Sequence, residues 1–314
     1  MRSMVIRDFG GPEVFEEREW ETPQPGPNQV LVKIHATSVN PVDFKLRQAG
    51  ASAGINPPAI LGYDVSGVVE DTGEAVTAFQ PGDEVFYTPE ISGKPGSYAE
   101  YHVADAGIVA HKPDGLSHDE AASLPLAGVT ALDGLIYRGP VEVGQDVLVH
   151  GAGGVGSLAI QIAVAAGARV FATCSDYMVD IVGDYGAVPV NYKTENFVER
   201  VNEATHGTGV DVVLDTVGGN TMARSIPVIK EHARIVNIIG TTADFHTANF
   251  KNPTVELIFL ERARSKLQRL RTLVERGQIT PLVDSVMDLS EVADAHRRLE
   301  SGGVTGKLVL RVSA

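Results

Sequence analysis

The residues with the clearest chemical meaning are a cluster of glycines in the middle of the chain. The sequence Gly-Ala-Gly-Gly-Val-Gly occupies positions Gly151 to Gly156. A short apolar run, Val147–His150, precedes it, and an apolar-periodic segment at Ser157–Ala166 and a second apolar run at Arg169–Thr173 follow it. This order predicts a strand, a tight turn, a helix and a second strand, which together form half of a dinucleotide-binding unit.

Each glycine of this turn has its own expected role. Gly151 permits the sharp turn off the strand, Gly153 removes a side chain where a pyrophosphate approaches the backbone, and Gly156 lets the helix lie close to the strand. The amides of Gly154 and Val155 then face the phosphate, helped by the helix dipole. Many glycine-rich turns only reverse the chain, but the flanking strands and helix favour nucleotide binding here.

Two later loops are expected to contact the same ligand. They consist of Val217 and Gly218 after the fourth strand of the series, and of Ile239, Gly240 and Thr241 after the fifth. In open α/β sheets, ligands bind outside the carboxyl ends of the strands. The topology therefore makes these loop positions cofactor candidates.

The second half of the chain must supply the sheet that positions these loops. Strands are expected at Val147–His150, Val170–Thr173, Val188–Asn191, Val212–Asp215, Ile235–Ile239 and Val255–Leu260, with helical stretches between most of them. Such alternation indicates an α/β fold with a doubly wound parallel sheet and helices on both faces.

The first part of the chain, to about residue 122, has a different pattern. Short apolar or alternating runs occur at Met4–Ile6, Val30–His35, Val65–Val69, Glu84–Tyr87 and Tyr98–Val103, separated by turn signals. They predict a small β-barrel. Helices are expected at Ser117–Leu135, where Ser117 and Glu120 fit a capping box, and at Glu261–Arg276. The final strand, at Lys307–Val312, is expected to return to this first domain.

The composition limits the possible functions. The chain has 314 residues, a hydrophobic share of 43% and a formal net charge of −14, which argues against a general affinity for nucleic acid or an anionic membrane. Its one cysteine, Cys174, excludes an intramolecular disulfide and a zinc-ribbon cluster. No apolar run reaches transmembrane length and no signal-peptide core opens the chain, so we expect a cytoplasmic protein.

Several motifs along the chain resemble one known family. They are GGPEV at Gly10–Val14, SVNPVDFKLRQAG at Ser38–Gly50, LGYDVSGVV at Leu61–Val69, PGDEVF at Pro81–Phe86, GSYAEY at Gly96–Tyr101, AASLPLAGVTAL at Ala121–Leu132, DVVLDTVGG at Asp211–Gly219 and GKLVLRV at Gly306–Val312. With the glycine turn, this order resembles the zinc-free medium-chain dehydrogenases/reductases of the quinone oxidoreductase (zeta-crystallin-like) type. The resemblance implies a GroES-like β-barrel catalytic domain at residues 1–122 and 261–314, and a Rossmann dinucleotide-binding domain at 123–260.

The resemblance also implies chemistry without a metal. Zinc-dependent relatives carry a cysteine near Asn40, a His-Glu pair where Tyr63 and Asp64 stand here, and a four-cysteine structural lobe. Thiolate and imidazole ligands are what zinc sites need, and these positions lack them. We therefore expect no metal site, and we expect Asp64 to fix its loop through a basic partner.

Two polar residues of the first domain are candidate catalytic residues. By the resemblance, Asn40 lies beside the nicotinamide ribose, although an asparagine before Pro41 is also a common turn former in extended geometry. Tyr63 occupies the place of a lost zinc ligand. Its phenol either bonds or protonates a substrate carbonyl or enolate, or it is a wall of the pocket; the sequence leaves both readings open.

Two more positions have both a cofactor role and an ordinary structural reading. The resemblance places Thr130 near the cofactor phosphate, while a mid-helix threonine also bonds back to its own turn. Lys307 either neutralises a cofactor phosphate or is a solvated lysine at a strand end.

The end of the second strand is expected to select the cofactor. NAD-binding units place an acidic residue there for the ribose 2′-hydroxyl, and this place falls on Cys174, with Ser175 next. Neither residue repels a 2′-phosphate. Tyr192 matches a tyrosine near this phosphate in NADPH-using relatives, and Lys193 adds positive charge. Asp176 is the opposing feature, and we expect it to face solvent, so the cofactor is expected to be NADPH, with NADH possible.

The resemblance implies an NADPH-dependent oxidoreductase that transfers hydride to quinones or α,β-unsaturated carbonyl compounds. Two alternatives remain at this level: reduction of another substrate, such as an enoyl thioester or an aldehyde, and a dinucleotide-binding sensor or structural protein with little turnover. No nucleic-acid or membrane partner is expected. Relatives commonly form homodimers through the edge of the cofactor-domain sheet, and Ile235–Ile239 with Val255–Leu260 would suit that contact.

Overall fold

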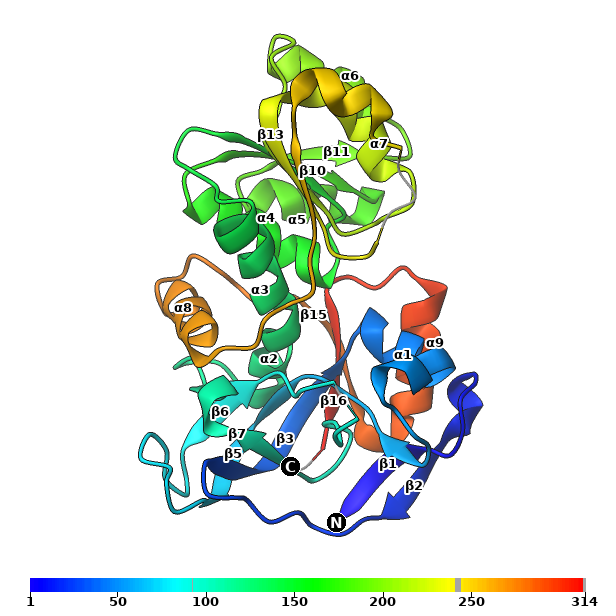
Figure 1. Cartoon of the computed structure of the whole chain (residues 1–314), viewed down its shortest axis with the longest axis vertical. Coiled ribbons are helices and arrows are strands. Elements are labelled where there is room, and N and C mark those ends of the chain that lie inside the picture. Colours follow the sequence, from blue (N-terminus) through cyan, green and yellow to red (C-terminus); the bar gives the residue numbers. More distant parts are fainter. Residues whose placement is uncertain (92, 241–243, 313–314) are drawn as a thin grey trace. The chain divides into compact units, whose positions relative to one another are not determined.

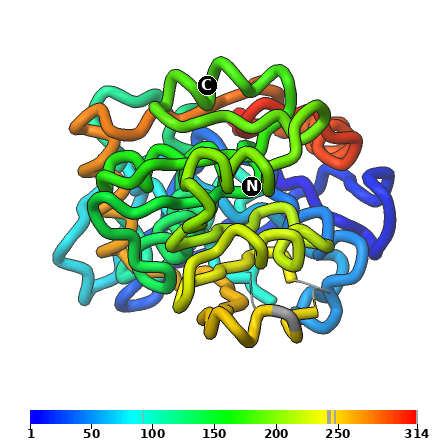
Figure 2. The backbone as a smooth tube through the Cα atoms, turned by 90° about the horizontal axis from the view of Figure 1, so that it is seen from above, coloured from blue at the N-terminus to red at the C-terminus, as the bar shows by residue number. Residues whose placement is uncertain are grey.

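A computed structural model describes residues 1–91, 93–240 and 244–312. The chain divides into two compact units. Unit 1 consists of Met1–Leu126, Arg262–Arg276 and Pro281–Ala314, and unit 2 consists of Ala127–Glu261 and Gly277–Thr280. Blue and red segments of the chain therefore belong to unit 1, and green to yellow segments to unit 2 (Figures 1 and 2).

Unit 1 is mostly β-structure. Its strands are β1 (Arg2–Ile6), β2 (Phe15–Glu19), β3 (Gln29–Val39), β4 (Ala59–Ile60), β5 (Val65–Thr72), β6 (Glu84–Tyr87), β7 (Tyr101–Asp105), β8 (Ala110–His111), β15 (Val283–Asp288) and β16 (Lys307–Arg311). Its helices are α1 (Pro41–Ala49), α2 (His118–Ala122), α8 (Arg264–Glu275) and α9 (Val292–Ser301). The larger sheet has the order β15-β16-β3-β5-β6-β8, and β7 also pairs with β3.

Strand β16 lies inside this sheet, between β15 and β3. β16 pairs antiparallel with β3 and parallel with β15, so segments from opposite ends of the chain are hydrogen-bonded neighbours. The predicted return of Lys307–Val312 to the first domain is confirmed. The predicted capping box at Ser117 and Glu120 is confirmed at the start of α2.

Unit 2 contains one six-stranded parallel sheet. Its strands are β9 (Asp146–His150), β10 (Arg169–Cys174), β11 (Val188–Asn191), β12 (Val210–Asp215), β13 (Ile229–Asn237) and β14 (Thr254–Leu257), in the spatial order β11-β10-β9-β12-β13-β14. Its helices are α4 (Gly154–Ala165), α5 (Val179–Asp184), α6 (Phe197–Ala204), α7 (Thr221–Ser225) and a π-helix at Asp133–Arg138; α3 (Pro125–Leu132) spans the boundary with unit 1. The predicted doubly wound parallel sheet is confirmed.

The sheet of unit 2 is held by rows of apolar side chains from neighbouring strands. Leu148, Phe171, Val213 and Ile235 are aligned by strand register and are buried in one core cluster. Helices α4 and α5 lie on one side of this sheet, and α6 and α7 on the other (Figure 1). Right-handed crossovers that reverse direction after β11 require this arrangement.

Several predicted boundaries were wrong. The single helix expected at Ser117–Leu135 is divided into α2, α3 and the π-helix, and the strand expected at Tyr98–Val103 begins only at Tyr101. β13 ends at Asn237, where the backbone turns so that Ile239 N donates to the Asn237 side chain, and β14 ends at Leu257. Helix α1 was missed, although Pro41 at its first position and Asp43 at its third are helix-start signals. Among the described residues, no helix combines the length and apolar character needed to cross a membrane.

Candidate active site

Three strand ends of unit 1 bring polar residues together. β5 and β16 both run antiparallel to β3 and flank it, so the start of each lies beside the end of β3. Asn40 directly follows β3, Asp64 directly precedes β5, and Lys307 opens β16. The register therefore places an amide, a carboxylate and an ammonium group next to one another, although they are far apart in the sequence.

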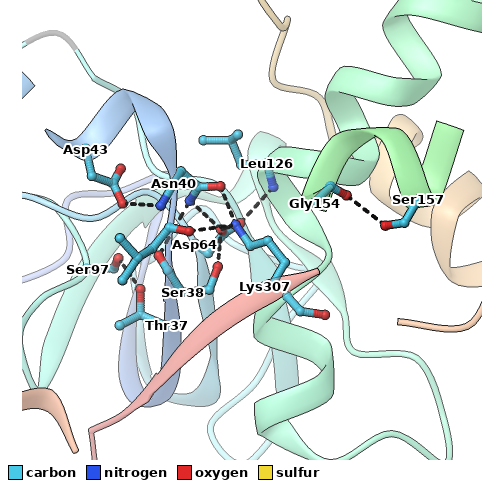
Figure 3. Close-up of polar contacts among 12 residues, drawn as sticks. Thr37, Ser38, Asn40, Asp43, Asp64, Ser97, Leu126, Gly154, Ser157 and Lys307 are labelled. Carbon is cyan, nitrogen blue, oxygen red and sulfur yellow. Dashed lines mark hydrogen bonds and ion pairs between the residues drawn. The ribbon is translucent and has the colours of Figure 1, made fainter. Parts of the chain in front are cut away.

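The carboxylate of Asp64 is the centre of this group (Figure 3). Its Oδ2 accepts hydrogen bonds from Ser38 Oγ at 2.5 Å and Asn40 Nδ2 at 2.7 Å, and it pairs with Lys307 Nζ at 3.3 Å. Its Oδ1 accepts from Leu126 N at 2.7 Å. Ser38, Asn40, Asp64 and Lys307 are all buried and are called the Asp64 cluster below. The expectation that a basic partner fixes Asp64 is confirmed.

The cluster also determines how Asn40 points. Lys307 donates to the side-chain oxygen of Asn40 while the amide nitrogen of Asn40 donates to Asp64, so both ends of the amide are assigned. Asn40 has extended backbone angles before Pro41, as expected. Lys307 is buried and ion-paired, so the reading of it as a solvated strand-end lysine was wrong.

Tyr63, the neighbour of Asp64, has a buried hydroxyl that lacks a hydrogen-bond partner among the described residues. Burial raises the pKa of Tyr63 well above its ordinary value of 10; the charge of Asp43 raises it further, and Arg262 opposes this. The phenol therefore stays protonated at neutral pH. A buried hydroxyl without a partner is costly, which favours a role as donor to a ligand over a role as a passive wall.

A second buried network lies behind Asp43. Arg47 Nη1 lies 3.0 Å from His296 Nδ1, His296 Nε2 lies 3.1 Å from Tyr98 Oη, and Tyr98 donates to Asp43 Oδ2 at 2.7 Å. Arginine has no acceptor, so His296 must accept at Nδ1 and donate from Nε2 to Tyr98. Burial, with the nearby charge of Arg47, lowers the pKa of His296 to about 3, which keeps it neutral.

Asp43 is the acceptor at the end of this hydrogen-bond chain, and it also caps helix α1. Its Oδ2 accepts from Asn40 N at 2.8 Å, while its Oδ1 is buried without a partner among the described residues. Burial raises the pKa of Asp43 to about 7, against the opposing hydrogen bonds from Tyr98 and Asn40 and the charge of Lys307. Asp43 and Tyr98 were not singled out from the sequence. Their signals were the helix-start position of Asp43 and the position of Tyr98 in the GSYAEY motif.

The glycine turn of unit 2 has the geometry expected for phosphate binding. Gly151 has a φ of +88°, and a Cβ on Gly156 would lie 1.9 Å from the Gly151 carbonyl oxygen. By contrast, a Cβ on Gly153 would meet no atom within 4 Å. Helix α4 starts at Gly154 and its first hydrogen bond runs from Ser157 N to Gly153 O, so the three preceding amides point out of the helix end.

Side chains at the ends of β10 and β11 form two exposed pairs. Ser175 Oγ lies 3.1 Å from Tyr192 Oη, and Lys193 Nζ lies 2.8 Å from Asp176 Oδ1. The solvent-facing reading of Asp176 is confirmed, since its side chain is 65% exposed. The hydrogen bond and charge of Lys193 lower the pKa of Asp176, which keeps the carboxylate ionised and paired.

The remaining candidates fall at several places in unit 2. Cys174 is buried at the end of β10, and burial raises the pKa of its thiol; Thr130 is buried in α3. Val217 and Gly218 follow β12, and Ile239 and Gly240 follow β13; the side chains of Val217 and Ile239 are exposed. Thr241 lies outside the described residues.

Two family models match the chain. Residues 26–114 match the family model described as an alcohol dehydrogenase GroES-like domain, and residues 185–310 match the one described as a zinc-binding dehydrogenase. The human protein named quinone oxidoreductase is 31% identical over 99% of this chain and 97% of its own length. This chain belongs to the quinone oxidoreductase family.

Two further proteins that are similar to this chain have NADPH in their names or descriptions. The chloroplastic NADPH-dependent alkenal/one oxidoreductase of Arabidopsis thaliana is 36% identical over 99% of this chain and 79% of its own length. A mycobacterial protein whose structure is described as complexed with NADPH superposes with a TM-score of 0.89, at 30% identity, over 99% of this chain and 100% of that one. The predicted fold of this quinone oxidoreductase family member, a GroES-like domain with a Rossmann sheet, is therefore confirmed.

Proposed function

We propose that this protein is an NADPH-dependent reductase that transfers hydride to quinones or α,β-unsaturated carbonyl compounds without a metal. The observation that carries the proposal is the open space at Gly153, at the N-terminal end of α4. A phosphate fits where a side chain is missing and where free amides and the positive end of the helix dipole converge. The names of the human and Arabidopsis relatives support quinones and enones as the substrate classes.

The chain's own groups suit the two ends of NADPH. The amides of Gly154, Val155 and Gly156 would hold the pyrophosphate. The hydroxyls of Ser175 and Tyr192 would donate to the 2′-phosphate, and the ion pair with Lys193 neutralises the only acidic side chain of the two exposed pairs. When bound, NADPH supplies the hydride.

Unit 1 would supply the groups that act on the substrate oxygen. Reduction of a quinone to a hydroquinone, or of an enone to a saturated ketone, takes up one hydride and one proton. The protonated Tyr63 hydroxyl would donate a hydrogen bond to the oxyanion that develops as hydride arrives, because it has no partner to give up in the part of the chain that the structure describes. The final proton comes through the phenol or from water.

The Asp64 cluster explains how the site can act without a metal. Lys307 already balances the charge of Asp64, and Ser38 and Asn40 occupy its lone pairs. Among the described residues, no group of three or more His, Cys, Asp or Glu side chains is arranged to hold a metal ion.

The function is tested by following NADPH absorbance with a panel of quinones, enones, enoyl thioesters and aldehydes, before and after prolonged chelation. We expect turnover of quinones or enones that chelation leaves unchanged. Turnover limited to thioesters or aldehydes, or activity that is lost with a stoichiometric metal, would refute the proposal.

We also propose that two copies associate through the edge strand β14. This strand ends the sheet of unit 2, and Leu257 and Phe259 are 64% and 68% exposed. An apolar edge of this kind invites pairing with a second strand. Analytical ultracentrifugation should give a dimer for the natural protein and a monomer for Leu257→Lys with Phe259→Lys; a natural monomer would contradict the proposal.

A further inference from the structure

Asp215 and Asn237 are buried polar side chains at the carboxyl ends of two neighbouring strands. Asp215 is the last residue of β12 and Asn237 the last residue of β13, and the parallel register pairs them. Buried polar side chains are retained where they satisfy other polar groups, so their partners indicate their role.

The two side chains make the same pair of contacts with the loops that follow them. Asp215 Oδ1 accepts from Val217 N and Gly218 N, both at 2.9 Å. Asn237 Oδ1 accepts from Ile239 N at 3.0 Å and Gly240 N at 2.6 Å. Asn237 Nδ2 then donates to Asp215 Oδ2 at 2.9 Å, which joins the two loops through one hydrogen bond.

The loops held in this way also touch each other. Gly218 has a φ of +80°, and a Cβ built there would lie 3.1 Å from Ile239 Cγ2 and 3.3 Å from the Gly240 carbonyl oxygen. The loop after β12 also reaches the glycine turn, because a Cβ on Gly151 would lie 3.0 Å from Val217 Cγ2. A shift of either loop therefore changes the shape of the surface beside the turn.

We propose that Asp215 and Asn237 are positioning residues that together hold the loops Val217–Gly218 and Ile239–Gly240 in register for the nicotinamide half of NADPH. The inference rests on the proposed NADPH-dependent function and on the expectation that the loops at the carboxyl ends of β12 and β13 contact the cofactor. The pair touches the loop backbone and acts on the cofactor through it. Ser175 and Tyr192, the groups proposed for the 2′-phosphate, follow β10 and β11 on the other side of β9, so binding of the adenosine half should depend little on the pair.

The polarity of the pair allows a sharp test. In Asp215→Asn, the new amide can take two orientations. In one, its NH2 group faces the backbone N–H groups of Val217 and Gly218; in the other, it faces the NH2 group of Asn237, so a donor meets a donor in both. In Asn237→Asp, two buried carboxylates face each other. In the double exchange, Asp215→Asn with Asn237→Asp, every hydrogen-bond donor again faces an acceptor, and the net charge is unchanged. Asp105→Asn is the matched control, because Asp105 is exposed in unit 1 and likewise accepts a hydrogen bond from a following backbone amide, that of Gly107.

The experiment titrates each variant with NADPH and with 2′-phospho-ADP-ribose, which lacks nicotinamide, and measures quinone turnover. Each single exchange should weaken NADPH binding about ten- to a hundredfold, as expected for a lost hydrogen bond to a charged group, and leave binding of the fragment within about twofold. The double exchange should recover NADPH binding and turnover to within about threefold, and the control should match the natural protein.

The outcomes separate this inference from the proposed function. If the natural protein binds NADPH and reduces quinones, but the single exchanges affect both ligands equally or neither, the positioning role is wrong. A double exchange no better than the singles has the same meaning. Failure of all three variants to fold would also overturn it, because the pair would then hold the sheet instead of the loops. A natural protein that binds no NADPH would refute the proposed function itself.

Discussion

The ammonium nitrogen of Lys307 lies 3.3 Å from a carboxylate oxygen of Asp64, and both side chains are buried. Removal of one partner would leave the other charge buried and unpaired. Lys307→Met should therefore lower the free energy of unfolding by about 3 kcal/mol or more, as measured by urea denaturation.

The exposed pair of Lys193 and Asp176 is the control, and Lys193→Met should give no measurable change because water screens both charges. Similar small effects of the two substitutions would mean that Lys307 is not needed to compensate Asp64.

The glycine turn offers a contrast between two positions three residues apart. Gly153→Val should fold, since a Cβ there meets no atom within 4 Å, yet lose NADPH binding because the side chain would occupy the proposed phosphate space. Gly156→Val should fail to fold, because its Cβ would collide with the Gly151 carbonyl. Circular dichroism and cofactor titration measure the two effects. Unchanged NADPH affinity in folded Gly153→Val would mean that the turn serves packing alone.

Two of the buried tyrosines of unit 1, Tyr63 and Tyr98, should respond differently to loss of the hydroxyl. Tyr63→Phe should keep its stability and lose about a hundredfold in kcat, since the hydroxyl has no hydrogen-bond partner among the described residues and is proposed to donate to the substrate oxygen. Tyr98→Phe should lose stability by about 1 to 3 kcal/mol, because Asp43 and His296 both lose a partner. A Tyr63→Phe enzyme with natural kcat would make Tyr63 a wall of the pocket.

Cofactor preference should follow the pairs at the ends of β10 and β11. We expect a higher kcat/KM with NADPH than with NADH, and Ser175→Ala should reduce that ratio roughly tenfold by removing a donor to the phosphate. Asp176→Ala should leave NADPH preferred, because Lys193 already engages that carboxylate. A natural preference for NADH that Asp176→Ala reverses would show that Asp176 binds the ribose.

Asp43 should make the stability of the protein depend on pH. Its pKa is raised to about 7 in the folded state, from an ordinary value of 3.8, so the folded protein binds this proton more tightly than the unfolded chain does. The stabilising contribution is complete below about pH 4 and is lost as the pH rises through about 7.

The comparison with Asp43→Asn isolates this effect, because the buried histidines are common to both proteins. Between about pH 5 and about pH 8, the natural protein should lose about 3 kcal/mol of unfolding free energy relative to the variant. Tyr98→Phe should extend the loss to higher pH, because it removes a hydrogen bond that lowers the pKa of Asp43. Parallel stability curves for the natural protein and Asp43→Asn would contradict the assignment.

Features that depend on neighbouring residues were predictable from the sequence. The glycine turn and the alternation of strands and helices are local patterns, and they gave the parallel sheet and the position of α4 correctly. The ion pair between Asp64 and Lys307 joins residues 243 positions apart, and it forms only because of the register in which β16 pairs with β3. No local pattern contains that register, so only the need of Asp64 for a basic partner was foreseen.

The missed residues have the same physical cause. Tyr98 and His296 are 198 positions apart, and their contact requires α9 to pack near a segment that proved not to be a strand. Asp215 stood at the end of one predicted strand and Asn237 inside another, where alternation draws attention to apolar neighbours. The available signal was a polar residue at the end of a strand with a glycine three residues later.

The position of β16 between β15 and β3 has a consequence for biosynthesis. A ribosome makes β3 early and completes all of residues 127–261 before β15 and β16 emerge. Throughout that interval the Ala36–Val39 part of β3 lacks its partner strand β16, while the segment for unit 2 is already available to fold. Nascent chains of intermediate length therefore expose an unpaired strand edge. Chaperone binding and misassembly should be most frequent for these chains, until β16 has left the ribosome.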